Sequence, residues 1–102
     1  MAIEIQGEMY DFKFTPLRVE RIEKVMGKSM VNAFYQEGGM LPLADIKTIF
    51  VNGLKKEDGG YILPKTGEDV FYRIMDEIGY APLIGMIEEA LERDCPFFFR
   101  EA

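Results

Sequence analysis

The chain has no histidine, no tryptophan and one cysteine among its 102 residues. Without histidine it lacks the commonest general acid/base near neutral pH, the Ser-His and Cys-His nucleophile pairs, and the usual zinc ligands. Cys95 cannot form a disulfide within the chain and has no partner that would activate it, so we expect a buried or half-buried structural thiol. Carboxylates are plentiful, but they fall on the polar faces of the expected helices, where charge serves solubility. We therefore expect no enzyme, no metal site and no cofactor.

Long apolar runs and dense basic clusters are also missing. No stretch approaches the ~18 apolar residues that a membrane-spanning helix needs, and Met1 to Glu4 do not begin a secretion signal. With the single cysteine, this favours a cytoplasmic protein. The net charge is −6 and the densest cationic pair, Lys55-Lys56, is followed directly by two acidic residues. Because affinity for nucleic acid needs clustered Lys and Arg, we expect neither nucleic acid nor membrane as a partner.

Two short segments imitate ligand-binding loops without their essential residues. Gly27-Lys28-Ser29 matches the end of a phosphate-binding P-loop, but the position five residues earlier is Ile22 instead of glycine. The preceding segment, 16–26, also has helical and not strand periodicity. The loop from Lys55 to Gly60 lacks the alternating oxygen ligands of a calcium loop. We interpret the first segment as a helix stop followed by a helix cap.

Ordinary globular composition, with 48% hydrophobic and 29% charged residues, predicts one domain over residues 1–102. Its beginning shows the period-two alternation of strands and predicts a β-hairpin over about 3–14. Gly7-Glu8 fits a two-residue type II′ turn. That turn would pair Ile5 with Tyr10 and Ile3 with Phe12, placing all four side chains on one face.

Helical periodicity follows the hairpin and predicts about five short helices between residues 16 and 94, with a tail over 95–102. The predicted starts are Thr15-Pro16, Ser29, Pro42, Thr66 and Pro82, and the predicted stops include Gly27, Gly38-Gly39 and Gly79. The apolar stripes expected to face the core are Leu17, Ile22, Val25 and Met26; Met30, Val31 and Phe34; Leu43, Ile46, Ile49, Phe50 and Leu54; Val70, Phe71, Ile74, Met75 and Ile78; and Leu83, Ile84, Ile87, Ala90 and Leu91. Gly53 within the third helix indicates either close helix packing or fraying, and 55–66 is expected to be a loop. The predicted fold class is α+β, mainly α.

Two features suggest a binding protein. Seven methionines serve either adaptable contact surfaces or gaps in the core. Near the C-terminus, Phe97, Phe98 and Phe99 stand in a row, and neighbours on an extended segment point to opposite sides. At least one should therefore be exposed in an isolated monomer, where aromatic side chains commonly mark protein contacts. The alternative is a terminal strand or turn that buries all three.

Four segments form a wider pattern over nearly the full chain: an opening strand, an amphipathic helix, a Gly-to-Pro segment leading into a helix, and paired C-terminal helices. They are Met9 to Phe14; Glu23 to Ser29; Gly39 to Ile46 with Ile49-Phe50 and Gly53-Leu54; and Ile78-Gly79-Tyr80 with Ile87 to Leu91. This succession resembles the tail assembly chaperones of long-tailed bacteriophages and prophages, of the kind common in Gram-positive hosts.

The resemblance implies a non-enzymatic role in virion morphogenesis. Such chaperones coat the long, aggregation-prone tape measure protein until tail tube subunits replace them, self-associate in rings or spirals, and often have a longer product made by ribosomal frameshifting. The resemblance implies no cofactor and no catalytic residues. The exposed-aromatic argument makes Phe97, Phe98 and Phe99, with Tyr80 and Met86, the candidates for self-association or client binding. Two alternatives remain: a structural phage component, such as a head–tail connector or tail completion protein, and a small regulatory adaptor or antitoxin.

Overall fold

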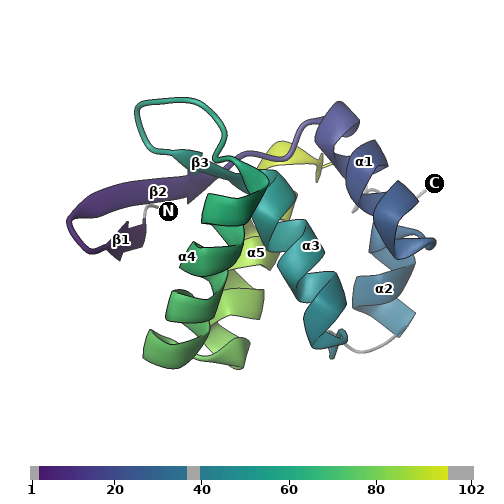
Figure 1. The fold of residues 1–102 in the computed structure, drawn as a ribbon. Coiled ribbons are helices and arrows are strands. Elements are labelled where there is room, and N and C mark those ends of the chain that lie inside the picture. The colour runs from purple at the N-terminus through teal and green to yellow at the C-terminus, as the bar shows by residue number, and fades with distance from the viewer. Residues whose placement is uncertain (1–2, 37–39, 97–102) are drawn as a thin grey trace.

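Three strands and five helices make up the part of the chain that the computed structural model describes, residues 3–36 and 40–96 (Figure 1). In chain order they are β1 (Ile3–Ile5), β2 (Glu8–Phe12), α1 (Pro16–Met26), α2 (Met30–Gln36), α3 (Leu43–Gly53), β3 (Leu54–Lys56), α4 (Pro64–Glu77) and α5 (Tyr80–Asp94). The predicted fold class, mainly α with an N-terminal hairpin and five helices, is confirmed. None of the described helices combines the length and the apolar character that crossing a membrane requires.

The hairpin turn lies one residue earlier than the sequence suggested, which shifts the pairing of the two strands by two residues. Gln6 and Gly7 form the turn with φ of 51° and 82°, and positive φ at both positions is what a type I′ turn requires. Ile3 therefore pairs with Tyr10 and not with Phe12, so the predicted register was wrong. A shift of two residues leaves every side chain on its original face, and the four residues predicted to share one face, Ile3, Ile5, Tyr10 and Phe12, are all buried.

A third strand begins at Leu54, which was wrongly predicted to belong to the third helix, and continues into the predicted loop. β3 pairs antiparallel with β2, with Lys55 opposite Asp11, and completes a sheet of order β1-β2-β3. The chain then folds back over the outer edge of β3, where the Lys56 N–H donates to Gly60 O at 3.1 Å and the Ile62 N–H donates to Leu54 O at 3.2 Å. The strand is too short to show a period-two signal, which explains why the loop prediction missed it.

Helix α1 begins and ends where the sequence indicated. Thr15 caps it by accepting a hydrogen bond from the Arg18 N–H at 3.2 Å, and Gly27 stops it with φ of 72°. Its predicted apolar stripe is wrong at two positions, because Leu17 is 57% exposed and Val25 is 70% exposed. The helix buries Val19 and Ile22 instead, with Met26 partly buried on the same side. At about 100° per residue, Leu17 lies roughly 160° around the helix from Val19 and must face outward.

The later helices keep their predicted order with shifted starts. Helix α4 begins at Pro64, two residues before the predicted cap Thr66, because proline suits the first helical position. Helix α5 begins at Tyr80, also two residues before the predicted Pro82. Gly79 is confirmed as the residue that ends α4, with φ of 94° and its N–H donating to Ile74 O at 3.2 Å. Ser29 caps α2 by accepting from the Asn32 N–H at 3.3 Å, whereas the predicted stop at 38–39 lies outside the described residues.

The core lies where the sheet meets the helices. Helix α3 lies between α1 and α4 and packs against both, and α5 lies behind α3 and α4 (Figure 1). Phe50 stands at the centre, with its ring edge-on to Phe12 and to Phe71 at 5.4 Å in both cases. The predicted apolar stripe of α5 is buried throughout, while Ile78 of the α4 stripe is exposed.

Gly53 serves a contact that neither sequence interpretation anticipated. It is buried as the last residue of α3, so the end does not fray, and it admits the ring of Phe14. A Cβ at this position would lie 2.3 Å from Phe14 Cε1. Close helix packing occurs at Gly67 instead, where a Cβ would lie 3.4 Å from Val51 Cγ1 and α4 approaches α3.

Candidate functional site

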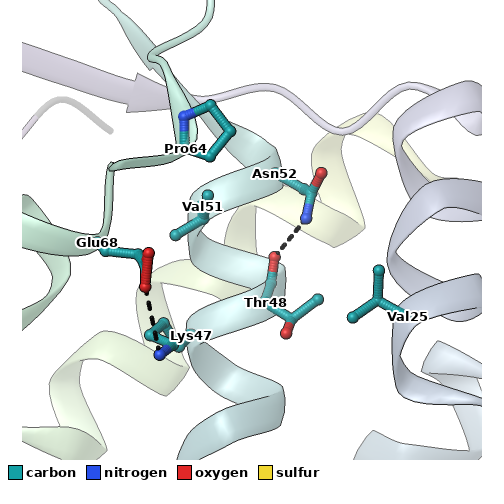
Figure 2. A pocket seen from close by; sticks show the side chains of 7 residues that line it. All are labelled: Val25, Lys47, Thr48, Val51, Asn52, Pro64 and Glu68. Carbon is teal, nitrogen blue, oxygen red and sulfur yellow. Dashed lines mark hydrogen bonds and ion pairs between the residues drawn. The ribbon is translucent and has the colours of Figure 1, made fainter. Parts of the chain in front are cut away.

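A groove of about 210 Å³ runs along the outer side of α3, between α1 and α4 (Figure 2). Its lining residues come from all three helices: Val25 from α1; Lys47, Thr48, Val51 and Asn52 from α3; and Pro64 and Glu68 from α4. Val25 projects from α1 toward the α3 residues, and Pro64 and Glu68 lie on the opposite side (Figure 2). Because the buried side of α3 faces the core, these α3 residues form the outward side of the same helix.

The geometry follows from how neighbouring helices pack on α3. On the α4 side, Gly67 is buried against Val51, where an added Cβ would lie in ordinary van der Waals contact. On the α1 side, Val19 and Ile22 enter the core and leave Val25 at the rim. The groove is therefore bounded by two helices and floored by a third, a shape suited to an extended or helical peptide.

An ion pair closes one end of the groove. Lys47 Nζ lies 3.5 Å from Glu68 Oε1 (Figure 2). It also donates a hydrogen bond to Tyr72 Oη at 3.2 Å. The hydrogen bond to Tyr72 and the nearby Glu68 charge raise the pKa of Lys47 above its ordinary value. Lys47 is therefore a cation at neutral pH.

The polar groups on the floor bond within their own helix. Thr48 Oγ1 donates to Ala44 O at 3.0 Å, and Asn52 Nδ2 donates to Thr48 O at 2.9 Å. Because these polar groups are already hydrogen-bonded, the aliphatic side chains of Val25 and Val51 are the part of the groove surface that is open to contact. Burying that aliphatic surface against another chain would be favourable.

A second hollow, of about 450 Å³, lies where the end of α5 meets β2 and β3. The Asp94 side chain is 1% exposed there. Its Oδ2 accepts from the Phe14 N–H at 2.9 Å, and its Oδ1 accepts from Arg93 Nε at 2.8 Å and lies 3.4 Å from Lys13 Nζ. Burial raises the pKa of Asp94, but the hydrogen bonds from Arg93 and Phe14 and the nearby cations outweigh it, so the pKa lies below its ordinary value.

The other groups of this hollow are also engaged. Arg93 donates to Phe12 O, and its Nη1 lies 3.5 Å from Asp11 Oδ1. Cys95 is buried, as expected, and its thiol donates to Phe14 O at 3.3 Å. Burial, with the Asp94 charge, raises the pKa of the Cys95 thiol and disfavours the reactive thiolate. We call this cluster of Asp11, Lys13, Arg93, Asp94 and Cys95 the latch, because it fastens the end of α5 to the start of the chain.

The described residues offer no metal site, because within 3–36 and 40–96 there is no group of three Cys, Asp or Glu side chains that could hold a metal ion. In the same ranges, no buried side-chain nitrogen or oxygen lacks a hydrogen-bond partner.

Neither Tyr80 nor Met86, the two predicted contact residues that the structure describes, lines the groove. Tyr80 is half-buried, and its hydroxyl donates to Leu41 O at 2.8 Å, which ties the start of α5 to the segment before α3. Met86 is half-buried and packs against the core. Phe97, Phe98 and Phe99 lie outside the described residues.

Sequence reasoning missed the groove because it placed Val25 in the core. A signal was present: Val19, Ile22 and Met26 form a tighter helical stripe than the predicted one, and choosing it leaves Leu17 and Val25 outside. The described surface carries further large apolar side chains that are more than one-third exposed. They are Met9, Leu17, Val25, Met40, Leu43, Leu63, Tyr72 and Ile78.

Comparisons of the chain with protein-family models, with curated proteins and with solved structures find no match in any of the three.

Proposed function

We propose that this chain is a non-enzymatic tail assembly chaperone of a long-tailed phage or prophage, which binds the tape measure protein and self-associates during tail morphogenesis. The observation that carries the proposal is the groove along α3, where exposed aliphatic side chains face outward from a domain whose core is already filled. The succession of strand and helix motifs along the chain supports the same family.

The chemistry of the groove suits the apolar face of a helical client. An amphipathic helix binds by laying its apolar face into a groove between helices, with anchors every three or four residues. Val25 and Val51 offer aliphatic contact, and the Lys47–Glu68 pair offers a polar end. One groove of this size gives weak binding, which suits a client that must later be released to tail tube subunits.

Weak sites become effective when they are repeated. Several copies along one long client convert later binding events into intramolecular ones, so avidity exceeds the affinity of any single groove. The net charge of −6 keeps the unbound chaperone soluble. An acidic surface also repels nucleic acid, consistent with a protein client alone.

The test is co-expression with the tape measure protein of the same phage, followed by pull-down and size-exclusion chromatography with light scattering. We expect a soluble complex, and a client that precipitates when it is expressed alone. A monodisperse monomer that leaves the client insoluble would overturn the proposal. Stoichiometric presence of this chain in purified particles would also overturn it, in favour of a connector or completion protein.

A pair of matched variants tests the groove itself. Val25→Lys places a charge on the groove wall, whereas Met9→Lys makes the same change at another exposed apolar position, in β2 and outside the groove. We expect Val25→Lys to reduce the amount of soluble client several-fold and Met9→Lys to leave it unchanged, with both variants folded by circular dichroism. Equal effects of the two variants would rule out the groove as the client site.

A further inference from the structure

The outer side of α1 is a basic face. Leu17, Arg21 and Lys24 are spaced i, i+4 and i+7 within α1, so they form one stripe opposite the buried side of the helix. Lys28 follows beyond the Gly27 cap and lies 2.8 Å from Asp45 in α3. Leu17 adds an exposed aliphatic side chain to the stripe, and Glu20 lies at its edge. We call Leu17, Arg21 and Lys24 the basic face.

The outer side of α5 is an acidic face. Gly85, Glu88, Glu89 and Glu92 are spaced i, i+3, i+4 and i+7 and are all exposed. Gly85 exposes bare helix backbone between the side chains of this face, and a Cβ built there would meet nothing within 4 Å. The fold therefore does not require glycine at this position, although glycine costs a helix about 1 kcal/mol relative to alanine. We call Gly85, Glu88, Glu89 and Glu92 the acidic face.

These two faces cannot meet within one molecule. Helix α1 lies at one end of the row that α3 and α4 continue, and α5 lies behind α3 and α4 (Figure 1). Each face looks away from the core, because the opposite side of its helix is buried. A second copy of the chain, however, presents the complementary face to each of them.

The charges also decide between the possible pairings of two copies. Two acidic faces would bring six glutamates together. Two basic faces would place Arg21 and Lys24 of one copy against the same residues of the other, so like charges repel in both symmetric pairings. The mixed pairing is attractive. It also sets the bulk of Leu17 against the bare backbone at Gly85, which permits close approach of the two helices.

We propose that copies of this chain associate head to tail, with the basic face of one copy docked on the acidic face of the next. The inference deepens the self-association within the proposed function and rests on it for its role. Since each docked pair keeps one free face of each kind, the contact repeats into a closed ring or an open spiral, depending on the rotation between copies. Two helices of 11 and 15 residues make a small interface, so association is concentration-dependent and weakens with salt.

The experiment uses the purified full chain without client, in sedimentation velocity over a range of concentrations. Arg21→Glu with Lys24→Glu makes both faces acidic, and Glu88→Lys with Glu92→Lys makes both faces basic. We expect the apparent mass of the wild-type protein to rise with concentration. Each double variant should stay monomeric over the same range, with an association constant at least tenfold lower. An equimolar mixture of the two double variants should assemble again, because each basic face then meets an acidic one. Thermal melting confirms that both variants are folded.

Three results would overturn the contact. They are a wild-type monomer at every concentration, wild-type-like assembly of the Glu88→Lys, Glu92→Lys variant by itself, and an equimolar mixture that stays monomeric. Gly85→Leu gives an independent check, because it fills open space without a clash in the monomer and should block assembly. A client that stays insoluble while the purified chain still assembles would refute the chaperone proposal and leave this contact standing.

Discussion

The latch and the groove are two hollows of one small domain, and they differ in what their side chains do. In the latch, the Asp94 carboxylate is buried and bonded to Phe14, Arg93 and Lys13. In the groove, Val25 is 70% exposed and contributes only aliphatic surface. A hollow whose groups satisfy one another stabilises the fold, whereas a hollow that leaves apolar surface open is available to a partner. Substitutions in the latch should therefore destabilise the fold, whereas substitutions in the groove should leave its stability unchanged.

The largest effect is expected at the centre of the latch. Asp94→Ala leaves the Phe14 N–H without its acceptor and the Arg93 and Lys13 cations without their shared carboxylate. Breaking a buried, hydrogen-bonded charge cluster costs about 3 kcal/mol of unfolding free energy. Urea denaturation measures the loss, with the exposed neighbour Glu92→Ala as control, expected within about 0.5 kcal/mol of wild type. If the two variants are equally stable, Asp94 does not hold the chain together.

A close approach beside the latch comes next. Gly53→Ala would put a methyl group 2.3 Å from Phe14 Cε1, and the fully buried ring has to move. Overpacking of this kind costs about 2 kcal/mol. Gly60→Ala is the matched control, since nothing lies within 4 Å of its Cβ. Both variants are compared by thermal melting, and a Gly53→Ala melting point equal to that of wild type would show that the ring has room.

Acid should weaken the latch selectively. The pKa of Asp94 is lower in the folded protein than in the unfolded chain, where it is about 3.9. Its contribution is therefore fully present above the unfolded pKa and is lost as the pH falls through the folded pKa. Urea denaturation of wild type and Asp94→Asn at pH 7 and pH 3 should show a stability gap that narrows in acid. An unchanged gap at pH 3 would mean that the carboxylate charge contributes nothing to the fold.

The smallest effect on stability is expected in the groove. Val25→Ala removes exposed apolar surface from α1 and substitutes a better helix former, so the unfolding free energy should stay within about 0.5 kcal/mol of wild type. The same variant should solubilise less of the tape measure protein in co-expression. The comparison of the two hollows fails if Val25→Ala unfolds the domain, or if it leaves client solubility untouched.

Local signals in the sequence were sufficient for much of the fold. Thr15 and Gly27 mark the ends of α1 through cap chemistry that acts within one helical turn, and the alternation of Ile3 and Ile5 marks a strand by itself. The apolar stripe of α5 was also correct, because a 15-residue amphipathic helix samples its period four times. Features that depend on neighbours within a few residues were predictable.

What depends on distant segments was not predictable. The hairpin register follows from the turn that the whole sheet accommodates, and β3 exists because β2 lies beside it. In the sequence Gly53 looked like a helix-packing glycine, but in the structure it makes room for the ring of Phe14, 39 positions earlier in the chain. To predict the groove, one would have to know which side of α1 meets α3, and the two possible apolar stripes of that helix differ by only a few residues.

The latch also sets the order in which the chain can finish folding during its own synthesis. The Phe14 N–H and its acceptor Asp94 are 80 positions apart. At about 5–20 residues per second, the ribosome needs on the order of 4–16 seconds to make the second after the first. For that interval the Phe14 N–H and the Phe12 carbonyl lack their partners on α5, and unpaired backbone groups of a strand are a template for pairing with another chain. The final turn of α5 is the segment whose emergence ends that exposure.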